Sequence, residues 1–561
     1  MTGVNMGIFL VMLALFLAVT VGLGVFGYKH TKSDNQEFLL GRSKTNPIII
    51  ALSYGATFLS ASAVIGFGGQ AAVHGQSLMW LCFLNLFVGL FVAFIFFGTR
   101  TRRKGAEVGA STFADLLGKV FKSNKIRAFT AIIIIIMMPI YCAAVLKGGV
   151  NSLATITGMQ EYYNYILVAL AIVVGVYVVY GGIIAVMYND AFQAGIMFIG
   201  MAVILVVTFV TLGGITDANT QLADLWNSGI ISSTGTLSGF NGWNDTASFG
   251  TPEWLTVVTT FFLGVGIGAL TQPQLVVRFM SSNDDKSLNK SLIIGSIFML
   301  VIVGSAYTVG PLSNVFFYNE HGMASFEYLK SLGLGTDYII PQFVLEIFKD
   351  ITFGDIFVCL FLLSLVCAAV STISALMHTI GVAGGYDLWS LIESRKIGRP
   401  KDSQSIEINR AVTVIVLVLV VVYCYLMPSN IIAKATSLFM GMSACALLPA
   451  FVMALYCKTP RRDAALASIA VGTVSYLFWA LFINSGMSVF VPVCKWITGN
   501  AVLFPGSLAS YVDPLLVALP LSVLTMIETL LPTKCLKNAE KHFQHRGLNP
   551  QIYTVLRYAN A

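Results

Sequence analysis

A group of hydroxyl side chains inside an apolar segment points most directly to ion binding. Ser371, Thr372 and Ser374 follow Ala368 within the apolar run 352–380. Hydroxyls in an apolar helix usually bond back to carbonyls of their own helix, which is the simpler interpretation. A hard monovalent cation, however, needs several oxygen ligands, and hydroxyls with free backbone carbonyls supply them without a buried negative charge. Ser371 and Thr372 are therefore candidate cation ligands.

Ionisable residues in or beside the apolar runs are few. They are Asp190, Lys147 and Lys434, together with Arg278 and Arg410 at the cytoplasmic ends of two runs. A charge at the bilayer centre costs about 2.5–3.5 kcal/mol on insertion scales, so each is a functional candidate. The alternative for the lysines and Arg278 is that the side chain snorkels to the membrane surface. The alternative for Asp190 is an acid at a helix N-terminus, where it opposes the helix dipole.

Two apolar runs carry residues that weaken a helix. The run 48–70 contains hydroxyls and glycines throughout and no charge, and the run 256–278 has three alternate glycines from Gly264 and then Pro273. Interrupted backbone is tolerated in lipid only where it lines a cavity or packs on protein. We therefore expect two broken helices, with close packing of small residues as the alternative.

These residues belong to a chain whose composition predicts an all-α polytopic membrane protein. Of its 561 residues, 57% are hydrophobic and 11% are charged, against roughly 25% charged residues in soluble domains. Thirteen apolar runs are long enough to be transmembrane helices. They lie near 7–28, 48–70, 78–98, 127–148, 161–180, 191–213, 256–278, 291–313, 352–380, 410–427, 431–456, 464–485 and 513–532. The unbroken runs disfavour a β-barrel.

The sequence contains no arrangement typical of an enzyme. Its nine cysteines include no CxxC, its six histidines are scattered, and it has no G-x-x-x-x-G-K-[ST] phosphate loop. We expect no catalytic residues and no nucleic-acid partner.

The positions of the two broken runs predict inverted repeats. They are the second and seventh runs, and helices five apart cross the membrane in opposite directions. Two inverted five-helix repeats that each open with a broken helix point to a midplane site in a secondary transporter. We expect one transmembrane domain over 1–561, made of 1–47 (first span and loop), 48–213 and 256–456 (the repeats), 457–532 (peripheral spans) and 533–561 (tail).

The distribution of Lys and Arg predicts the orientation. One set of loops holds most of them, whereas the loop 214–255 holds none. By the positive-inside rule, the basic loops and the C-terminus are cytoplasmic and the N-terminus is outside, in a multi-pass protein of the cell membrane. We expect the protein to function as a monomer in the lipid bilayer.

Several segments together resemble the sodium:solute symporter family. The similar segments are 38–42, 57–66, 180–193, 271–280, 368–374 and 449–466, and they cover nearly the whole core in the right order. The resemblance implies the leucine-transporter type of fold, with spans 2–11 as its core. It also implies a sodium site between spans 2 and 9, with Na⁺ as the coupling ion.

Ligands follow from the resemblance position by position. They are the backbone carbonyls of Ala56, Leu59 and Ala368 and the hydroxyls of Ser371 and Thr372. Asp190 matches the family's acid near the ion path, which makes it a candidate for a second ion site.

Departures from the family pattern bear on the solute. The position after Thr57 is Asp in proline symporters and Phe58 here, and Val265 and Ala269 replace an aromatic pair. These changes argue against a simple transfer of proline specificity. A carboxylate would offset the cost of the ammonium of Lys147 in a low-dielectric site.

We therefore predict a sodium-coupled symporter that works by alternating access on a small organic anion such as a monocarboxylate or pantothenate. Its solute pocket is expected to comprise Thr57, Phe58, Ser60, Ser62, Lys147, Val265 and Ala269. The alternatives are symport of proline or another amino acid, proton coupling through Asp190, and a membrane sensor or structural subunit that uses the same fold without transport.

Overall fold

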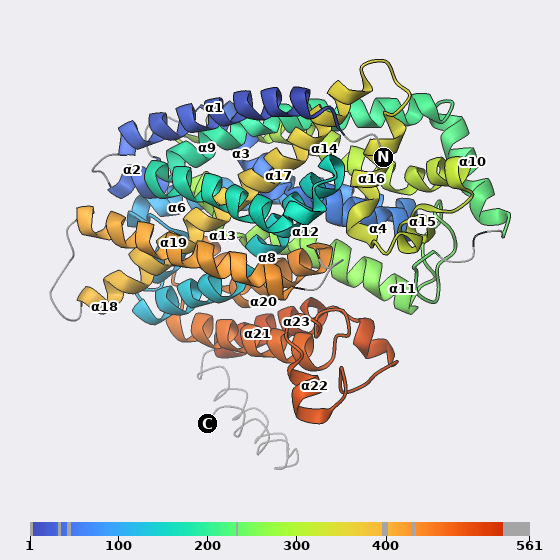
Figure 1. The fold of residues 1–561 in the computed structure, drawn as a ribbon. Helices are drawn as coiled ribbons and strands as arrows, with labels where there is room; N and C mark the ends of the chain where they lie inside the picture. The colour runs from blue at the N-terminus through green and yellow to red at the C-terminus, as the bar shows by residue number, and fades with distance from the viewer. Residues whose placement is uncertain are drawn as a thin grey trace, which may run out of the picture.

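The computed structural model describes residues 4–31, 35–41, 46–229, 231, 234–394, 402–427 and 432–530, and within these ranges the chain is helical and without strands (Figure 1). The segment 533–561, predicted to be a cytoplasmic tail, and Arg42 of the family-like segment 38–42 lie outside the described residues. The prediction of an all-α polytopic protein is confirmed.

Ten helical stretches of the described chain are long and apolar enough to cross a bilayer. They are Met6–His30, Ser62–Val108, Asn124–Thr157, Gln160–Thr211, Pro252–Met280, Asp285–His321, Gly354–Glu393, Ile406–Leu426, Ile432–Tyr456 and Arg462–Phe482. Two shorter apolar helices, Pro47–Phe58 and Leu515–Leu530, lie where the second and thirteenth spans are predicted. The number of thirteen crossings stays a prediction.

Local sequence explains where several helices begin and turn. Helix α3 (Pro47–Phe58) begins at Asn46, whose side chain accepts a hydrogen bond from the backbone of Ile48, and proline opens its first turn. Helix α9 (Tyr163–Thr211) joins two helices at Gly182, whose φ of 59° is a left-handed conformation that favours glycine. This junction lies between the fifth and sixth predicted spans.

Both predicted broken helices are present. Helix α3 ends at Phe58 and is followed by the non-helical residue Leu59 (φ −91°, ψ 77°). The chain continues as a π-helix, η1 (Ser62–Gly66), and α4 (Phe67–His74). The second broken helix comprises α11 (Pro252–Trp254), η5 (Leu255–Leu263), α12 (Gly264–Gly268), η6 (Ala269–Thr271) and α13 (Pro273–Met280). Its break falls at Gln272, which has extended φ and ψ (−67°, 114°) immediately before the proline.

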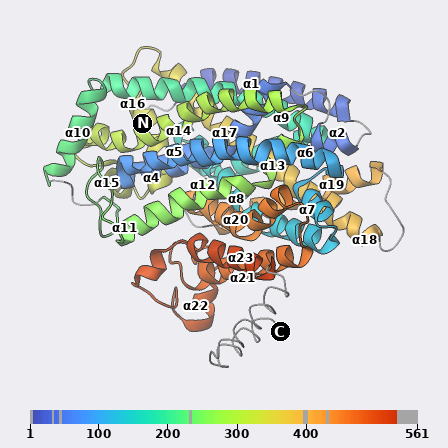
Figure 2. The same cartoon turned by 180° about the vertical axis from the view of Figure 1, so that it is seen from behind.

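The helices form one elongated bundle (Figures 1 and 2). One end, here named the α10 end, carries α10 (Ile215–Asn227), α11, α15 (Ser325–Ser331) and α22 (Val493–Thr498). The opposite end, the α2 end, carries α2 (Asn35–Leu40), α6 (Thr99–Val108) and α18 (Ser390–Ser394).

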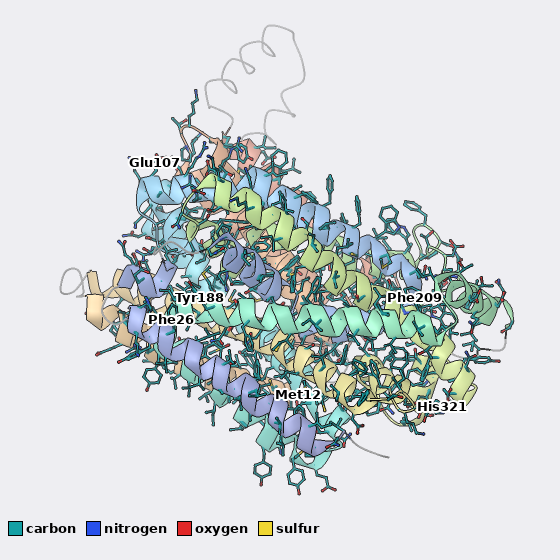
Figure 3. The ribbon with its side chains drawn as sticks, turned by 90° about the horizontal axis from the view of Figure 1, so that it is seen from above. Met12, Phe26, Glu107, Tyr188, Phe209 and His321 are labelled. Atoms are coloured by element: carbon teal, nitrogen blue, oxygen red, sulfur yellow. The ribbon has the colours of Figure 1, made fainter. Side chains whose placement is uncertain are left out.

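Two sides of the bundle are covered by peripheral helices. Helices α21 (Arg462–Phe482) and α23 (Leu515–Leu530) lie together and pack on α20 (Ile432–Tyr456). On another side, α1 (Met6–Thr31) runs beside α9, where Phe26 and Tyr188 bring their ring centroids to 5.2 Å (Figure 3).

Candidate functional site

The break after α3 lies against three hydroxyl-bearing side chains of α17 (Gly354–Val382), which are Ser371, Thr372 and Ser374. Ser371 Oγ donates to the Ala56 carbonyl at 3.0 Å, and Thr372 Oγ1 donates to the Thr57 carbonyl at 3.1 Å. Thr372 Oγ1 also lies 3.4 Å from the Ala56 carbonyl. These residues are buried. Both hydroxyls therefore bond across to the broken helix, and that of Ser371 also bonds within its own helix.

This set of donors suits a hard monovalent cation. Ser371 Oγ lies 3.3 Å from the Ala368 carbonyl, so two hydroxyls and the carbonyls of Ala56, Thr57 and Ala368 are brought together. All are oxygens and none carries a formal charge, which fits Na⁺ better than a divalent or soft metal ion. Leu59 stands at the break itself, and no recorded hydrogen bond of the described residues joins its carbonyl to α17.

An ion pair lies next to this set. Arg278 of α13 places its Nη2 3.1 Å from Asp190 Oδ2, and both side chains are fully buried. Ser53 Oγ and Thr57 Oγ1 donate to the same carboxylate oxygen at 2.8 and 3.1 Å. Ser53 and Thr57 are four residues apart on α3 and so share one helix face. The cluster thereby joins α3, α9 and α13.

The structure excludes two interpretations considered from the sequence, namely that Arg278 snorkels and that Asp190 lies at a helix N-terminus. Arg278 does not snorkel: its Nη1 bonds to the Gln274 carbonyl at 2.7 Å, and its remaining nitrogens face Ser53, Thr57 and Asp190. Asp190 is eight residues beyond Gly182, about two turns into its helix, so it does not cap a helix N-terminus.

Ser374 lies between the ion pair and the other two of these hydroxyl-bearing residues of α17, Ser371 and Thr372. Its Oγ lies 3.5 Å from Asp190 Oδ1 and donates to the Ser371 carbonyl at 2.9 Å. One side chain therefore contacts both Asp190 and the helix turn that presents Ser371 and Thr372.

The contacts of the described residues bring some of the predicted pocket residues together and direct the polar groups of others elsewhere. The Phe58 ring and Ala269 lie close together, because a Cβ on Gly89 would stand 2.9 Å from the ring and 3.5 Å from Ala269 Cβ. Val265 is buried one turn before Ala269 on α12. Thr57, in contrast, turns its hydroxyl to the ion pair.

The two predicted serines lie at the start of the second half of the broken helix. Ser60 Oγ accepts from Tyr141 Oη at 3.2 Å and from the backbone N–H of Ser62 at 3.1 Å. Ser62 Oγ is buried and has no hydrogen-bond partner among the described residues. It is thus a polar group to which a bound solute could hydrogen-bond.

Lys147 is engaged elsewhere. Its Nζ donates to the carbonyl of Met427 at 2.6 Å and lies 3.4 Å from the carbonyl of Cys424. These carbonyls belong to the C-terminal end of α19 (Asp402–Leu426), where a cation is favourable. A helix end, rather than an open pocket, therefore holds the ammonium in this structure.

The two broken helices are tied to each other near both ends. Toward the α2 end, Arg278 on α13 bonds to Ser53 and Thr57 on α3. At the α10 end, His74 Nδ1 on α4 lies 2.5 Å from Glu253 Oε1 on α11, and both are buried. Movement of one broken helix relative to the other must change at least one of these polar contacts.

A pocket opens on the α2 side of the ion pair. It lies between α13, α17 and the start of α7 (Phe113–Val120). Thr112, Pro273, Val277, His378 and Asp387 are among its lining residues.

Comparison with known proteins identifies the family. The model of the sodium:solute symporter family matches residues 38–472, which is more than half of the chain. The chain belongs to the sodium:solute symporter family. It is therefore a membrane transporter rather than an enzyme, and its family couples the transport of a solute to Na⁺.

Curated relatives match along nearly the whole chain. A sodium/proline symporter 2 of Staphylococcus saprophyticus is 24% identical over 505 residues, covering 90% of this chain and 91% of the relative. The osmoregulated proline transporter OpuE of Bacillus subtilis is 25% identical over 521 residues, covering 91% and 94%.

A solved structure shows the same fold. A Na⁺-coupled sialic acid symporter in a substrate-bound outward-open state superposes with a TM-score of 0.68 at 17% identity, covering 94% of this chain and 98% of that one. The prediction of the inverted-repeat, leucine-transporter type of fold is thereby confirmed.

Proposed function

We propose that Na⁺ binds between the break after α3 and α17, and that its entry drives a small organic solute across the membrane by alternating access. The observation that carries this proposal is the contact of Ser371 and Thr372 with the carbonyls of Ala56 and Thr57. The ligand set comprises the carbonyls of Ala56, Leu59 and Ala368 and both hydroxyls, and the contacts add the Thr57 carbonyl.

Binding of Na⁺ would replace hydrogen bonds that now hold the two helices together. The hydroxyls would turn their lone pairs toward the ion, so that α3 and α17 are held by ion–oxygen contacts. Each charge that crosses a potential of 100 mV releases about 2.3 kcal/mol, which supplies part of the drive. Sodium and solute are coupled if both stabilise the same arrangement of the broken helices, and this coupling is reciprocal.

Asp190 is proposed to belong to the ion path. Arg278 and the hydroxyls of Ser53 and Thr57 surround one of its carboxylate oxygens, while Ser374 approaches the other at 3.5 Å. A cation near Ser374 would compete with Arg278 for the carboxylate. This arrangement supports a role of Asp190 in coupling. Proton transfer through Asp190 is the rival hypothesis, and it is the weaker one because Arg278 favours the ionised carboxylate.

For the solute we place proline or a related amino acid ahead of a simple organic anion. Two considerations support this order. The curated relatives that match along most of the chain are proline symporters, and Lys147, on which the expectation of an anion rested, bonds to a helix end. The side chains near the break that could define the pocket are Phe58, Ser60, Ser62, Val265 and Ala269.

The remaining parts of the proposal concern the orientation of the chain in the membrane and its oligomeric state. The Lys and Arg distribution supports a cytoplasmic C-terminus and an external N-terminus. One chain contains both broken helices and the complete ligand set, which supports function as a monomer.

Uptake into proteoliposomes tests the proposed function. Purified protein is given an inward Na⁺ gradient and a panel of labelled proline, other amino acids, a short monocarboxylate and pantothenate. We expect accumulation of proline that disappears when choline replaces Na⁺. Accumulation driven by a proton gradient alone would support the rival ion, and a complete lack of uptake across the panel would support a sensor or structural role.

Lys147→Met tests the solute assignment separately. Because the ammonium bonds to the end of α19, we expect a loss of stability of about 1–2 kcal/mol. Because the ammonium bonds to a helix end rather than to the solute, we expect the KM for the transported solute to change by less than about threefold, which corresponds to under 1 kcal/mol. Thermal unfolding and uptake kinetics measure the two effects.

Lys434→Met is the matched control, because Lys434 is another half-buried lysine within an apolar helix. A collapse of solute affinity in Lys147→Met alone would restore the anionic solute and place Lys147 in the pocket.

A further inference from the structure

A buried carboxylate stands beside the second broken helix, away from the sodium ligands. Asp513 precedes α23 and is fully buried. Its backbone N–H donates to Thr259 Oγ1 of η5 at 2.9 Å, and its Oδ1 accepts from the Leu515 N–H at 2.8 Å. These bonds fix the carboxylate between the first turn of α23 and the π-helical part of the broken helix.

The second carboxylate oxygen of Asp513 does not take part in these hydrogen bonds. Asp513 Oδ2 has no hydrogen-bond partner within the described ranges. It faces the junction of η5 and α12, because a Cβ on Gly264 would lie 3.7 Å from it and 3.7 Å from Ser437 Cβ on α20. An unpartnered buried oxygen is therefore aimed at the point where the broken helix, α20 and α23 meet.

The groups around this oxygen do not neutralise a negative charge. The titratable groups that interact with it electrostatically are the Cys445 thiol on α20 and the Tyr476 phenol on α21, neither of which is a cation. Tyr476 Oη donates to the Leu438 carbonyl at 3.0 Å and so does not serve the carboxylate. The Thr260 hydroxyl of η5 interacts with the carboxylate and favours its charged form, but it carries no charge itself. Thr259 of η5, Gly264 of α12 and Ser437 of α20 contribute no charge either.

An isolated carboxylate in an apolar site is strongly disfavoured, and it takes up a proton when no cation is near. We propose that Asp513 is a proton-binding site built into the packing of α23 on the second broken helix. A proton on Oδ2 removes the buried charge, and its release requires water to reach the carboxylate. Displacement of η5 or α12 during the transport cycle would provide that access, so proton binding and the position of this helix are linked.

The chemical environment agrees with this geometry. Asp513 lies in the connection before α23, and its burial raises the pKa of the carboxyl group to about 8, against the opposing effects of the Leu515 N–H and the Thr260 hydroxyl. A group whose pKa is raised by folding stabilises the fold fully below its unfolded value, which is near 4. That contribution is lost as the pH rises through the folded pKa. The protein should therefore lose stability progressively between about pH 4 and about pH 8.

Thermal unfolding of the full-length protein against pH tests the proposal. Asp513→Asn keeps the acceptor for Leu515 and has nearly the same volume, but it cannot ionise. We expect the Tm of the wild type to fall across this pH range by several degrees more than that of Asp513→Asn. Asp224→Asn is the control, since Asp224 is an exposed acid of α10. Equal pH dependence of the Tm in Asp513→Asn and in the wild type would overturn the proposal.

Infrared spectroscopy provides a second measurement on the unaltered protein. The C=O stretch of a buried, protonated carboxylic acid should be present at about pH 6 and lost above about pH 9. It should be insensitive to the exchange of KCl for NaCl. A band that disappears on addition of NaCl at constant pH would assign this oxygen to sodium and contradict proton binding. Neither readout depends on which solute is transported.

Discussion

Replacement of Ser371 and Thr372 together by alanine is expected to abolish sodium-driven uptake. Each hydroxyl is a ligand in the proposed sodium site, and loss of a hydrogen-bonding or ligating group to a charged partner costs about 1.5–3 kcal/mol. Together the losses come to at least about 3 kcal/mol, which corresponds to about a hundredfold or more in sodium affinity. Initial rates of uptake as a function of Na⁺ concentration measure the effect, and each single variant should show an intermediate half-saturation.

Ser364→Ala is the matched control for this experiment. Ser364 is a hydroxyl of the same helix, but it bonds to the Ile196 and Leu360 carbonyls, away from the broken helix. Its sodium half-saturation should remain that of the wild type. A wild-type sodium half-saturation in the Ser371→Ala/Thr372→Ala variant would show that sodium binds elsewhere.

Removal of Arg278 alone is expected to cause the largest loss of stability. Arg278→Gln leaves the buried carboxyl group of Asp190 without its cation, and breaking one side of a buried ion pair costs about 3–5 kcal/mol. Asp190→Asn/Arg278→Gln removes both charges and should recover most of this loss. We expect the double variant to be folded but poorly coupled, so that uptake no longer follows the sodium gradient. Thermal unfolding gives the stability, and the ratio of sodium to solute flux gives the coupling.

A surface ion pair serves as the comparison. Arg102 pairs with Asp285 at 2.6 Å, but both side chains are partly exposed, and such pairs are worth about 0–1 kcal/mol. Arg102→Gln should therefore change the Tm little. If Arg278→Gln were no less stable than Arg102→Gln, or if the double variant failed to recover stability, the proposed importance of the buried pair would be wrong.

The positions of the broken helices were predictable from the sequence because backbone breaks leave local signals. Glycines at alternate positions from Gly264 and the proline at 273 mark the second break, and hydroxyls and glycines without charge mark the first. Both features reflect short-range preferences of the backbone, which hold whatever the rest of the chain does. The contact of Ser371 and Thr372 with the first break then follows from the similarity to the family.

The pairing of Asp190 with Arg278 could not be derived in the same way. The two residues are 88 positions apart, and each has an adequate local interpretation at a helix end. A signal was nevertheless present, since Ser53 and Thr57 place two hydroxyls on one face of an uncharged helix. Such a face predicts a buried polar partner but does not identify it.

The prediction for Lys147 had the same weakness. Its charge in an apolar run indicated a functional partner, whereas the structure supplies the carbonyls of Cys424 and Met427. A helix C-terminus satisfies a cation as well as a solute carboxylate does, and only the packing of α8 (Asn124–Thr157) on α19 distinguishes them. The carboxylate of Asp513 likewise acquires its setting from three elements that are far apart in the sequence.

Sodium-specific stabilisation of the purified protein tests the central claim most directly. A ligand that binds only the folded state at a hundred times its Kd stabilises that state by about 2.7 kcal/mol. We predict that NaCl, relative to KCl at equal ionic strength, raises the Tm of the wild type and of Ser364→Ala with increasing concentration, but leaves that of Ser371→Ala/Thr372→Ala unchanged. An equal sodium-specific rise in the double variant would contradict a sodium site between α3 and α17.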